Sequence, residues 1–182
     1  MKIPFMLVIL FAACPATTLA EVIDAGEGGF TVVNEVVIGA ARDAVWQAAT
    51  AEVGHWWNPD HTISGDASLL SINAQPLGCF CERFGDNAGL VHMQVTMVNP
   101  GVIMRLTGGL GPLGLMGVSG NMTWELDAHE DGTRVTFTYA VGGYQPGGLE
   151  SIAAPVDAVI GEALLRLKDY VEADEQETRD LG

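Results

Sequence analysis

The stretch that decides the fold is LESIAAPVDAVIGEALLRLKDYVEA, Leu149 to Ala173. Its apolar residues recur at helical intervals, which predicts one long helix with a single apolar stripe. Pro155 predicts a kink, or a break after a short first segment, because proline removes a helical hydrogen bond. The stripe consists of Ile152, Val156, Val159, Ile160, Ala163, Leu164, Leu167, Tyr170 and Val171.

The residues before this helix alternate between apolar and polar, which is typical of strands with one buried face. Phe30 to Ile38 is rich in β-branched residues and predicts the first strand, and Ala40 to Ala51 predicts a short helix after it. Four further strands follow. Their expected inward residues are Val91, Met93, Val95, Met97, Val102, Met104, Leu106, Met122, Trp124, Leu126, Val135, Phe137, Tyr139 and Val141.

Together these elements predict an α+β protein of the helix-grip type. A curved antiparallel sheet wraps around the long C-terminal helix, which covers one face only. Apolar residues make up 48% of the chain and charged residues 17%, a balance that supports one folded domain. We assign residues 30–173 to this domain, 21–29 to a flexible glycine-rich segment, and 174–182 to an acidic tail.

The charge of the chain excludes one class of function. Asp and Glu number 23 against 8 Lys and Arg, so the formal net charge is -15. Nucleic-acid binding requires a basic surface that releases counterions, and here the cations are scattered singly along the sequence. We therefore expect no nucleic-acid partner.

The N-terminal residues 1–20 have the three parts of a secretory signal peptide. Lys2 precedes an apolar run from Ile3 to Ala13, and small residues lead to Ala20. The run is too short for a stable membrane span, which needs about 20 apolar residues. We expect a periplasmic or secreted protein. A less favoured alternative is a lipid anchor on Cys14, since residues 11–14 loosely resemble a lipoprotein box.

At sequence level the chain resembles the SRPBCC superfamily, which includes the START, birch-pollen-allergen (Bet v 1-like) and polyketide-cyclase groups. It is most similar to the branch grouped with activators of heat-shock-protein ATPase. The resemblance covers roughly residues 30–172 and consists of packing and turn residues, with no catalytic signature. The matching segments are Ile38 to Ala40 with Asp43 to Trp46, Gly54 to Trp57, Gly78 to Glu82, Asn99 to Gly101, Trp124 to Leu126, and Gly161 to Leu167.

The resemblance implies a cavity between sheet and helix that holds a hydrophobic or amphipathic small molecule, with no cofactor. The methionine-rich inward face agrees, because methionine adapts to varied ligands. The alternative is that these side chains simply fill a core. Candidate ligand-binding residues are Met93, Met97, Met104, Met122, Trp124, Phe137, Tyr139, Trp57, Val156 and Ile160.

Two glycine-rich stretches, residues 108–117 and 142–148, are expected to border the cavity mouth, as such loops do in helix-grip folds. The alternative is that they are only long connections. Tyr139, because it faces inward, is expected to offer its hydroxyl for orienting a ligand.

Residues that could carry chemistry are few. Tyr139, His61 and Glu82 are candidate acid and base groups for a polyketide-cyclase-like or lyase-type enzyme. His55, His61, Cys79, Cys81 and His92 lack the paired spacing of zinc ligands, so we expect no metal site. His92 is expected on the polar strand face, and the two cysteines are expected to be reduced, since a ring this small would be strained. A protein-interaction module is the third function class.

The signal peptide predicts that the mature chain starts at Glu21, after Ala20. N-terminal sequencing of the exported protein checks this. An acylated Cys14, or a retained Met1, would contradict it.

Overall fold

The computed structural model describes residues 19–180 and confirms the predicted fold class. The signal-peptide prediction falls mainly on residues 1–18, which lie outside the described residues. The strands are β1 (Leu19–Gly26), β2 (Gly29–Ile38), β3 (Leu70–Ile72), β4 (Cys79–Gly85), β5 (Ala88–Asn99), β6 (Ile103–Gly108), β7 (Gly117–His129) and β8 (Gly132–Tyr144). The helices are α1 (Arg42–Ala51), α2 (Val53–Trp56), α3 (Glu150–Asp180) and the short 3-10 turns η1 (Pro59–His61), η2 (Ala67–Leu69) and η3 (Gly111–Leu115).

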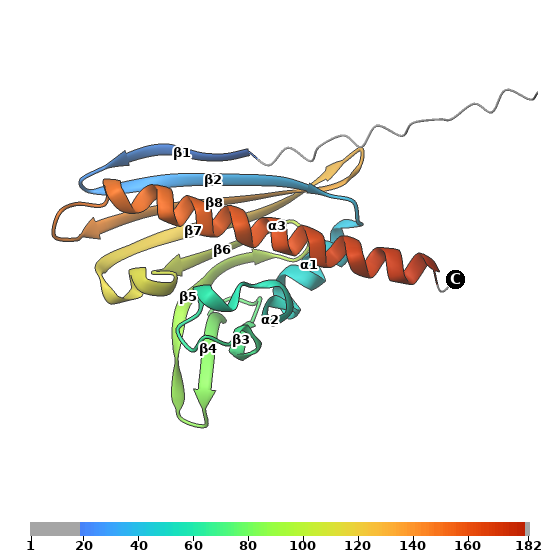
Figure 1. The fold of residues 1–182 in the computed structure, drawn as a ribbon, viewed down its shortest axis with the longest axis horizontal. Helices are drawn as coiled ribbons and strands as arrows, with labels where there is room; N and C mark the ends of the chain where they lie inside the picture. The colour runs from blue at the N-terminus through green and yellow to red at the C-terminus, as the bar shows by residue number, and fades with distance from the viewer. Residues whose placement is uncertain (1–18, 181–182) are drawn as a thin grey trace, which may run out of the picture.

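The strands form one antiparallel sheet of eight in the order β1-β2-β8-β7-β6-β5-β4-β3. Figure 1 shows α3 running across one face of this sheet, with α1 and α2 near the β3 and β4 end. The chain reaches that far edge through α1, α2 and the loop after them. Segments distant in sequence therefore meet beside α3.

The core lies between the sheet and α3, and strand alternation places most of it correctly. The predicted inward residues of β6, β7 and β8, among them Met104, Trp124 and Tyr139, are at most 5% exposed. From the helix, Ile160, Leu164, Leu167 and Val171 are equally buried. Each fully buried side chain of this kind stabilises the fold by about 1.5 to 3 kcal/mol.

The predicted phase of β5 is wrong at both of its ends. Met97 is 41% exposed and Val91 62% exposed, whereas His92 is only 4% exposed. The reason is two irregularities in register, one where Phe80 and Cys81 pair with Met93 and Val91, and one between Val95 and Met97. A bulge inserts one extra residue into a strand, so the residues beyond it change face.

The N-terminal segment also differs from the expectation of a flexible linker. Residues 19–26 form β1, an edge strand paired with β2 from Leu19↔Glu35 to Gly26↔Gly29. The glycines that suggested flexibility instead surround the two-residue hairpin turn at Glu27 and Gly28. Ala20 thus belongs to a strand, and cleavage after it would leave most of β1 in place.

The C-terminal helix is longer than expected and unbroken. α3 is continuous through Pro155, so of the two predicted alternatives, a kink or a break, the break is absent. It also extends to Asp180, through most of the segment predicted to be a frayed tail. None of the helices within residues 19–180 is long and apolar enough to cross a membrane.

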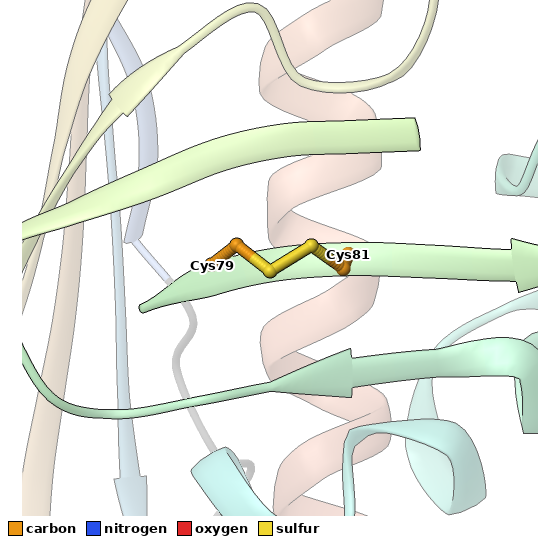
Figure 2. Close-up of a disulfide and its surroundings, with 2 residues drawn as sticks. All are labelled: Cys79 and Cys81. Atoms are coloured by element: carbon orange, nitrogen blue, oxygen red, sulfur yellow. A yellow bond between two sulfur atoms is a disulfide. The ribbon is translucent and has the colours of Figure 1, made fainter. Parts of the chain in front are cut away.

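The expectation of two reduced cysteines is wrong, because Cys79 and Cys81 form a disulfide. Figure 2 shows the two side chains joined along strand β4. Their Cα atoms are 5.4 Å apart, shorter than the distance of about 6.6 Å that two residues span on an extended strand. This local shortening brings the pair into the ordinary range for a disulfide.

The bulges in β5 predict opposite effects for two methionines of the same strand. Met93→Ala should lower the free energy of unfolding by about 2 to 5 kcal/mol, because it leaves a cavity in the core. Met97→Ala should change it by about 0.5 kcal/mol or less, because Met97 is exposed. Denaturant unfolding measures both, and equal losses would contradict the bulged register.

Candidate functional site

An apolar pocket of about 260 Å³ lies between η3 and the first half of α3. Tyr139 reaches it from the sheet, and the other lining residues come from the two flanking segments. No charged side chain lines it. The lining residues are Leu110, Pro112, Leu113, Met116, Tyr139, Ile152, Pro155, Val156, Val159 and Ile160.

A second pocket of about 170 Å³ adjoins the first and shares Leu110, Pro112 and Val159 with it. Its outer wall is the loop after α2, which adds polar groups to an otherwise apolar surface. The remaining lining residues are Trp57, Asp60, His61, Thr62, Ile63 and Gly111. We call the two together the double pocket.

The hydroxyl of Tyr139 holds the loop that covers the double pocket. It donates to the carbonyl of Gly108 at 3.1 Å and accepts from the N–H of Leu110 at 3.1 Å. Burial raises the pKa of Tyr139 to about 12, although the Leu110 bond opposes this rise. Since its donor and one acceptor position are already used, this hydroxyl fixes the loop, and the expectation that it also orients a ligand stays a prediction.

A buried histidine–carboxylate pair anchors the same loop from the other side. His92 Nε2 lies 3.0 Å from Glu82 Oε2, and both side chains are almost completely buried. The N–H of Gly111 donates to His92 Nδ1 at 3.2 Å. Because Nδ1 accepts a hydrogen bond, the geometry assigns His92 as a neutral imidazole with its proton on Nε2.

Glu82 extends this anchor to the opposite wall. Its carboxylate accepts the backbone N–H groups of Ile63 and Ser64 as well as the proton of His92. Burial raises the pKa of Glu82, but these hydrogen bonds outweigh it and leave the pKa below its ordinary value. For His92, burial lowers the pKa, and the attraction of Glu82 offsets this only in part. One buried pair therefore fixes both loops around the double pocket.

A second, more exposed polar group stands at the edge of the pocket. His61 Nε2 lies 3.0 Å from Glu162 Oε2, and Asn58 Nδ2 donates to the other carboxylate oxygen at 2.6 Å. The side chains of His61 and Glu162 are 32% and 40% exposed. This group ties η1 to α3.

The structure brings four of the predicted ligand-binding residues to the double pocket. Tyr139, Val156 and Ile160 line the first part and Trp57 the second. Met97 is exposed, as described above. The others, Met93, Met104, Met122, Trp124 and Phe137, are packed in the core and line neither part of the double pocket.

The three candidate catalytic residues do not form one group. Tyr139 lies in the apolar part, His61 at the edge, and Glu82 is bonded to His92 and lines neither part of the double pocket. The histidines and cysteines considered as zinc ligands are also separated. His55 stacks on Tyr170, while Cys79 and Cys81 bond to each other.

One exposed turn offers metal-ligating atoms close together within the described residues. His129, Glu130 and Asp131, at the β7–β8 turn, each provide one ligand atom, all within 4.8 Å of one another. His129 Nδ1 already accepts the N–H of Asp131 at 3.1 Å. Exposed acidic turns of this kind are common without an ion, and nothing else marks this one as a site.

The sequence patterns did not reveal that His92 is buried, and they did not show which of the two glycine-rich stretches lines the pocket. The glycine-rich stretch 108–117 was expected at the cavity mouth, and its Leu110, Leu113 and Met116 do line the pocket. The other stretch, 142–148, contributes nothing to either part. His92 was missed because alternation alone carries no sign of a bulge.

An antiparallel sheet gripping a long C-terminal helix, with a pocket beside that helix, defines a helix-grip protein of the START-like class. A family model described as polyketide cyclase / dehydrase and lipid transport matches residues 29–172. The chain belongs to this family, within the SRPBCC superfamily. No curated protein shows significant similarity to it.

Solved structures share the fold at low sequence identity. An uncharacterized protein from Rhizobium leguminosarum is 20% identical, with a TM-score of 0.54, covering 86% of this chain and 99% of its own. The Aha1 dimer from Colwellia psychrerythraea is 19% identical, with a TM-score of 0.55, covering 78% and 96%. CalU16 from Micromonospora echinospora is 16% identical, with a TM-score of 0.54, covering 88% and 86%.

The Glu82–His92 pair predicts a loss of stability in acid. The unfolded state takes up a proton on His92 near pH 6.5, whereas the folded state resists it, so stability falls as the pH drops below that value. Below pH 4.5, protonation of Glu82 lowers the stability further, because the pKa of this group is lower in the folded state than in the unfolded state. Free energies of unfolding measured between about pH 8 and pH 3.5 check both losses.

His92→Gln should remove the fall in the free energy of unfolding that wild type shows just below pH 6.5. His129→Gln, on the β7–β8 turn, is the matched control and should keep it. His92→Ala should lower the free energy of unfolding by about 1.5 to 3 kcal/mol, since the buried Glu82 carboxylate loses one of its three hydrogen-bond donors. An unchanged slope in His92→Gln would contradict the assigned pair.

Proposed function

We propose that this protein is exported and binds a hydrophobic or amphipathic small molecule in the double pocket. The observation that carries the proposal is the wall of the first part, in which apolar side chains surround Tyr139, whose hydroxyl is turned to the backbone. A mostly apolar concave site with a few polar groups is the usual form of a small-molecule site. Membership of a family described as polyketide cyclase / dehydrase and lipid transport supports the same conclusion.

The position of the pocket along α3 explains why it is open. In the second half of the apolar stripe, Leu164, Leu167 and Val171 are buried in the core. In the first half, Ile152, Val156 and Val159 are only partly buried and face η3 across the pocket. This half of the helix thus exposes an apolar surface that a ligand would cover.

The size of the site favours a small ligand. Typical ligand pockets have volumes of about 300 to 1,000 Å³. The first part, at about 260 Å³, is slightly smaller, and the adjoining 170 Å³ brings the double pocket into that range. A compact ring system or a short hydrocarbon chain fits this volume better than a long lipid.

Export is supported by the three-part pattern of residues 1–20 and by the disulfide. Disulfides persist in oxidising compartments and are rare in the cytosol. Cys79 and Cys81 are bonded although Cys79 is only partly buried. A bond of this kind fits a protein that works outside the cytoplasm.

A neutral apolar fluorophore, N-phenylnaphthylamine, tests the binding proposal. Its emission should rise when it binds, because the pocket is apolar. Val156→Trp should fill the pocket and weaken binding by at least about tenfold, while the protein stays folded because a void accepts the added volume.

Leu165→Trp is the matched control on the same helix, since Leu165 is 40% exposed and lines neither part of the double pocket. It should bind the fluorophore like the wild type. If the fluorophore does not bind, or if both variants bind it equally, the double pocket is not a binding site.

A further inference from the structure

The second part of the double pocket carries the polar groups that the first part lacks. Asp60 and His61 line it, and it joins the apolar part at Leu110, Pro112 and Val159. A molecule with one apolar and one polar end could therefore occupy both parts. Granted the proposed function, the chemistry of this polar end determines which ligands the site selects.

The free hydrogen-bonding atoms at this end are acceptors. A carboxylate only accepts, so His61 Nε2 carries the proton shared with Glu162, and Nδ1 is left as an acceptor whenever the ring is neutral. The carboxylate of Asp60 is exposed, and no hydrogen bond to it is found within residues 19–180. Thr62 already donates to Pro59 and accepts from Gly65.

The charges around this end are predominantly negative. Burial raises the pKa of Glu162, but its bonds to His61 and Asn58 outweigh this and leave the pKa below the ordinary value, so the carboxylate is ionised. Arg166, one turn further along α3, donates its Nε proton to the carbonyl of Trp56 at 2.7 Å. The carboxylates of Asp60 and Glu162 thus outnumber the one guanidinium, that of Arg166, on a chain whose net charge is -15.

We propose that the double pocket selects an amphipathic molecule whose polar end is a protonated amine. The apolar part occupies the space beside Val156 and Ile160, and the ammonium group donates to His61 Nδ1 and the Asp60 carboxylate. An ammonium group has three donors and no acceptor, which matches a wall of acceptors. It stays at the solvent edge, so it loses little hydration. A carboxylate at the same place meets like charges, and the residues that line this part of the pocket offer it no free donor.

Three probes with the same ring system test this selection: naphthylmethylamine, naphthylmethanol and naphthoate. Calorimetry at about pH 8, where imidazole side chains are in general neutral, measures their affinities. The amine should bind at least about tenfold more tightly than naphthoate, with the alcohol between them. Asp60→Asn should reduce the ratio of amine to naphthoate affinity by about threefold or more.

Glu125→Gln is the matched control, because it removes the same charge from an exposed position on β7 that lines neither part of the double pocket. It should leave the ratio nearly unchanged. An equal effect of both variants would show that only the overall charge matters and would overturn the inference.

The remaining outcomes separate this inference from the proposed function. Equal affinities for the three probes, or tightest binding of naphthoate, would overturn the inference and leave the binding site intact. The same holds if N-phenylnaphthylamine binds and none of the three does. If none of the four molecules binds, both the inference and the proposed function fail.

Discussion

The burial of the α3 stripe against the concave face of the sheet is the constraint on which the rest of the structure depends. Ile160, Leu164, Leu167 and Val171 are almost inaccessible to solvent and belong to one core cluster with the inward residues of β6, β7 and β8. Burial of apolar surface is the main favourable term in folding, so this contact sets where the helix lies. The pocket exists because the contact is incomplete. In its N-terminal half, α3 faces η3 across the pocket, and a space remains between these two segments.

Polar contacts keep that space from being filled by the loops beside it. Tyr139 fixes Gly108 and Leu110, His92 fixes Gly111, and Glu82 fixes Ile63 and Ser64. All three side chains are buried, where an unpaired polar group is costly and a paired one holds its partners firmly. Glycine-rich loops would otherwise be mobile. The walls of the double pocket are thus positioned by groups that do not themselves line its polar end.

The two histidine–carboxylate pairs of the site differ in environment, and this difference assigns them different roles. Glu82 and His92 are buried and mutually satisfied, so they serve the structure. Glu162 and His61 are partly exposed, and His61 lines the pocket, so His61 is accessible to a ligand there. A residue's type alone does not distinguish these roles. Its access to solvent and its unused hydrogen-bonding atoms do.

The sequence by itself determined the helix-grip fold, because helical and strand periodicities record which faces are buried. The stripe from Ile152 to Val171 and the alternation in β6 to β8 are local patterns, and the structure follows them. The apolar character of residues 108–117 also pointed to a pocket wall. Family resemblance added the expectation of a cavity beside the helix.

Only the tertiary structure decided the site. The bulges in β5 turned His92 inward and Met97 outward, and no local pattern encodes a bulge because it depends on how two strands pair. The Glu82–His92 and His61–Glu162 contacts join residues 10 and 101 positions apart, so their spacing in the sequence carries no signal. Whether buried methionines fill a core or line a cavity depends on packing between distant elements. In this protein they fill the core, and the pocket lies beside the core, between η3 and α3.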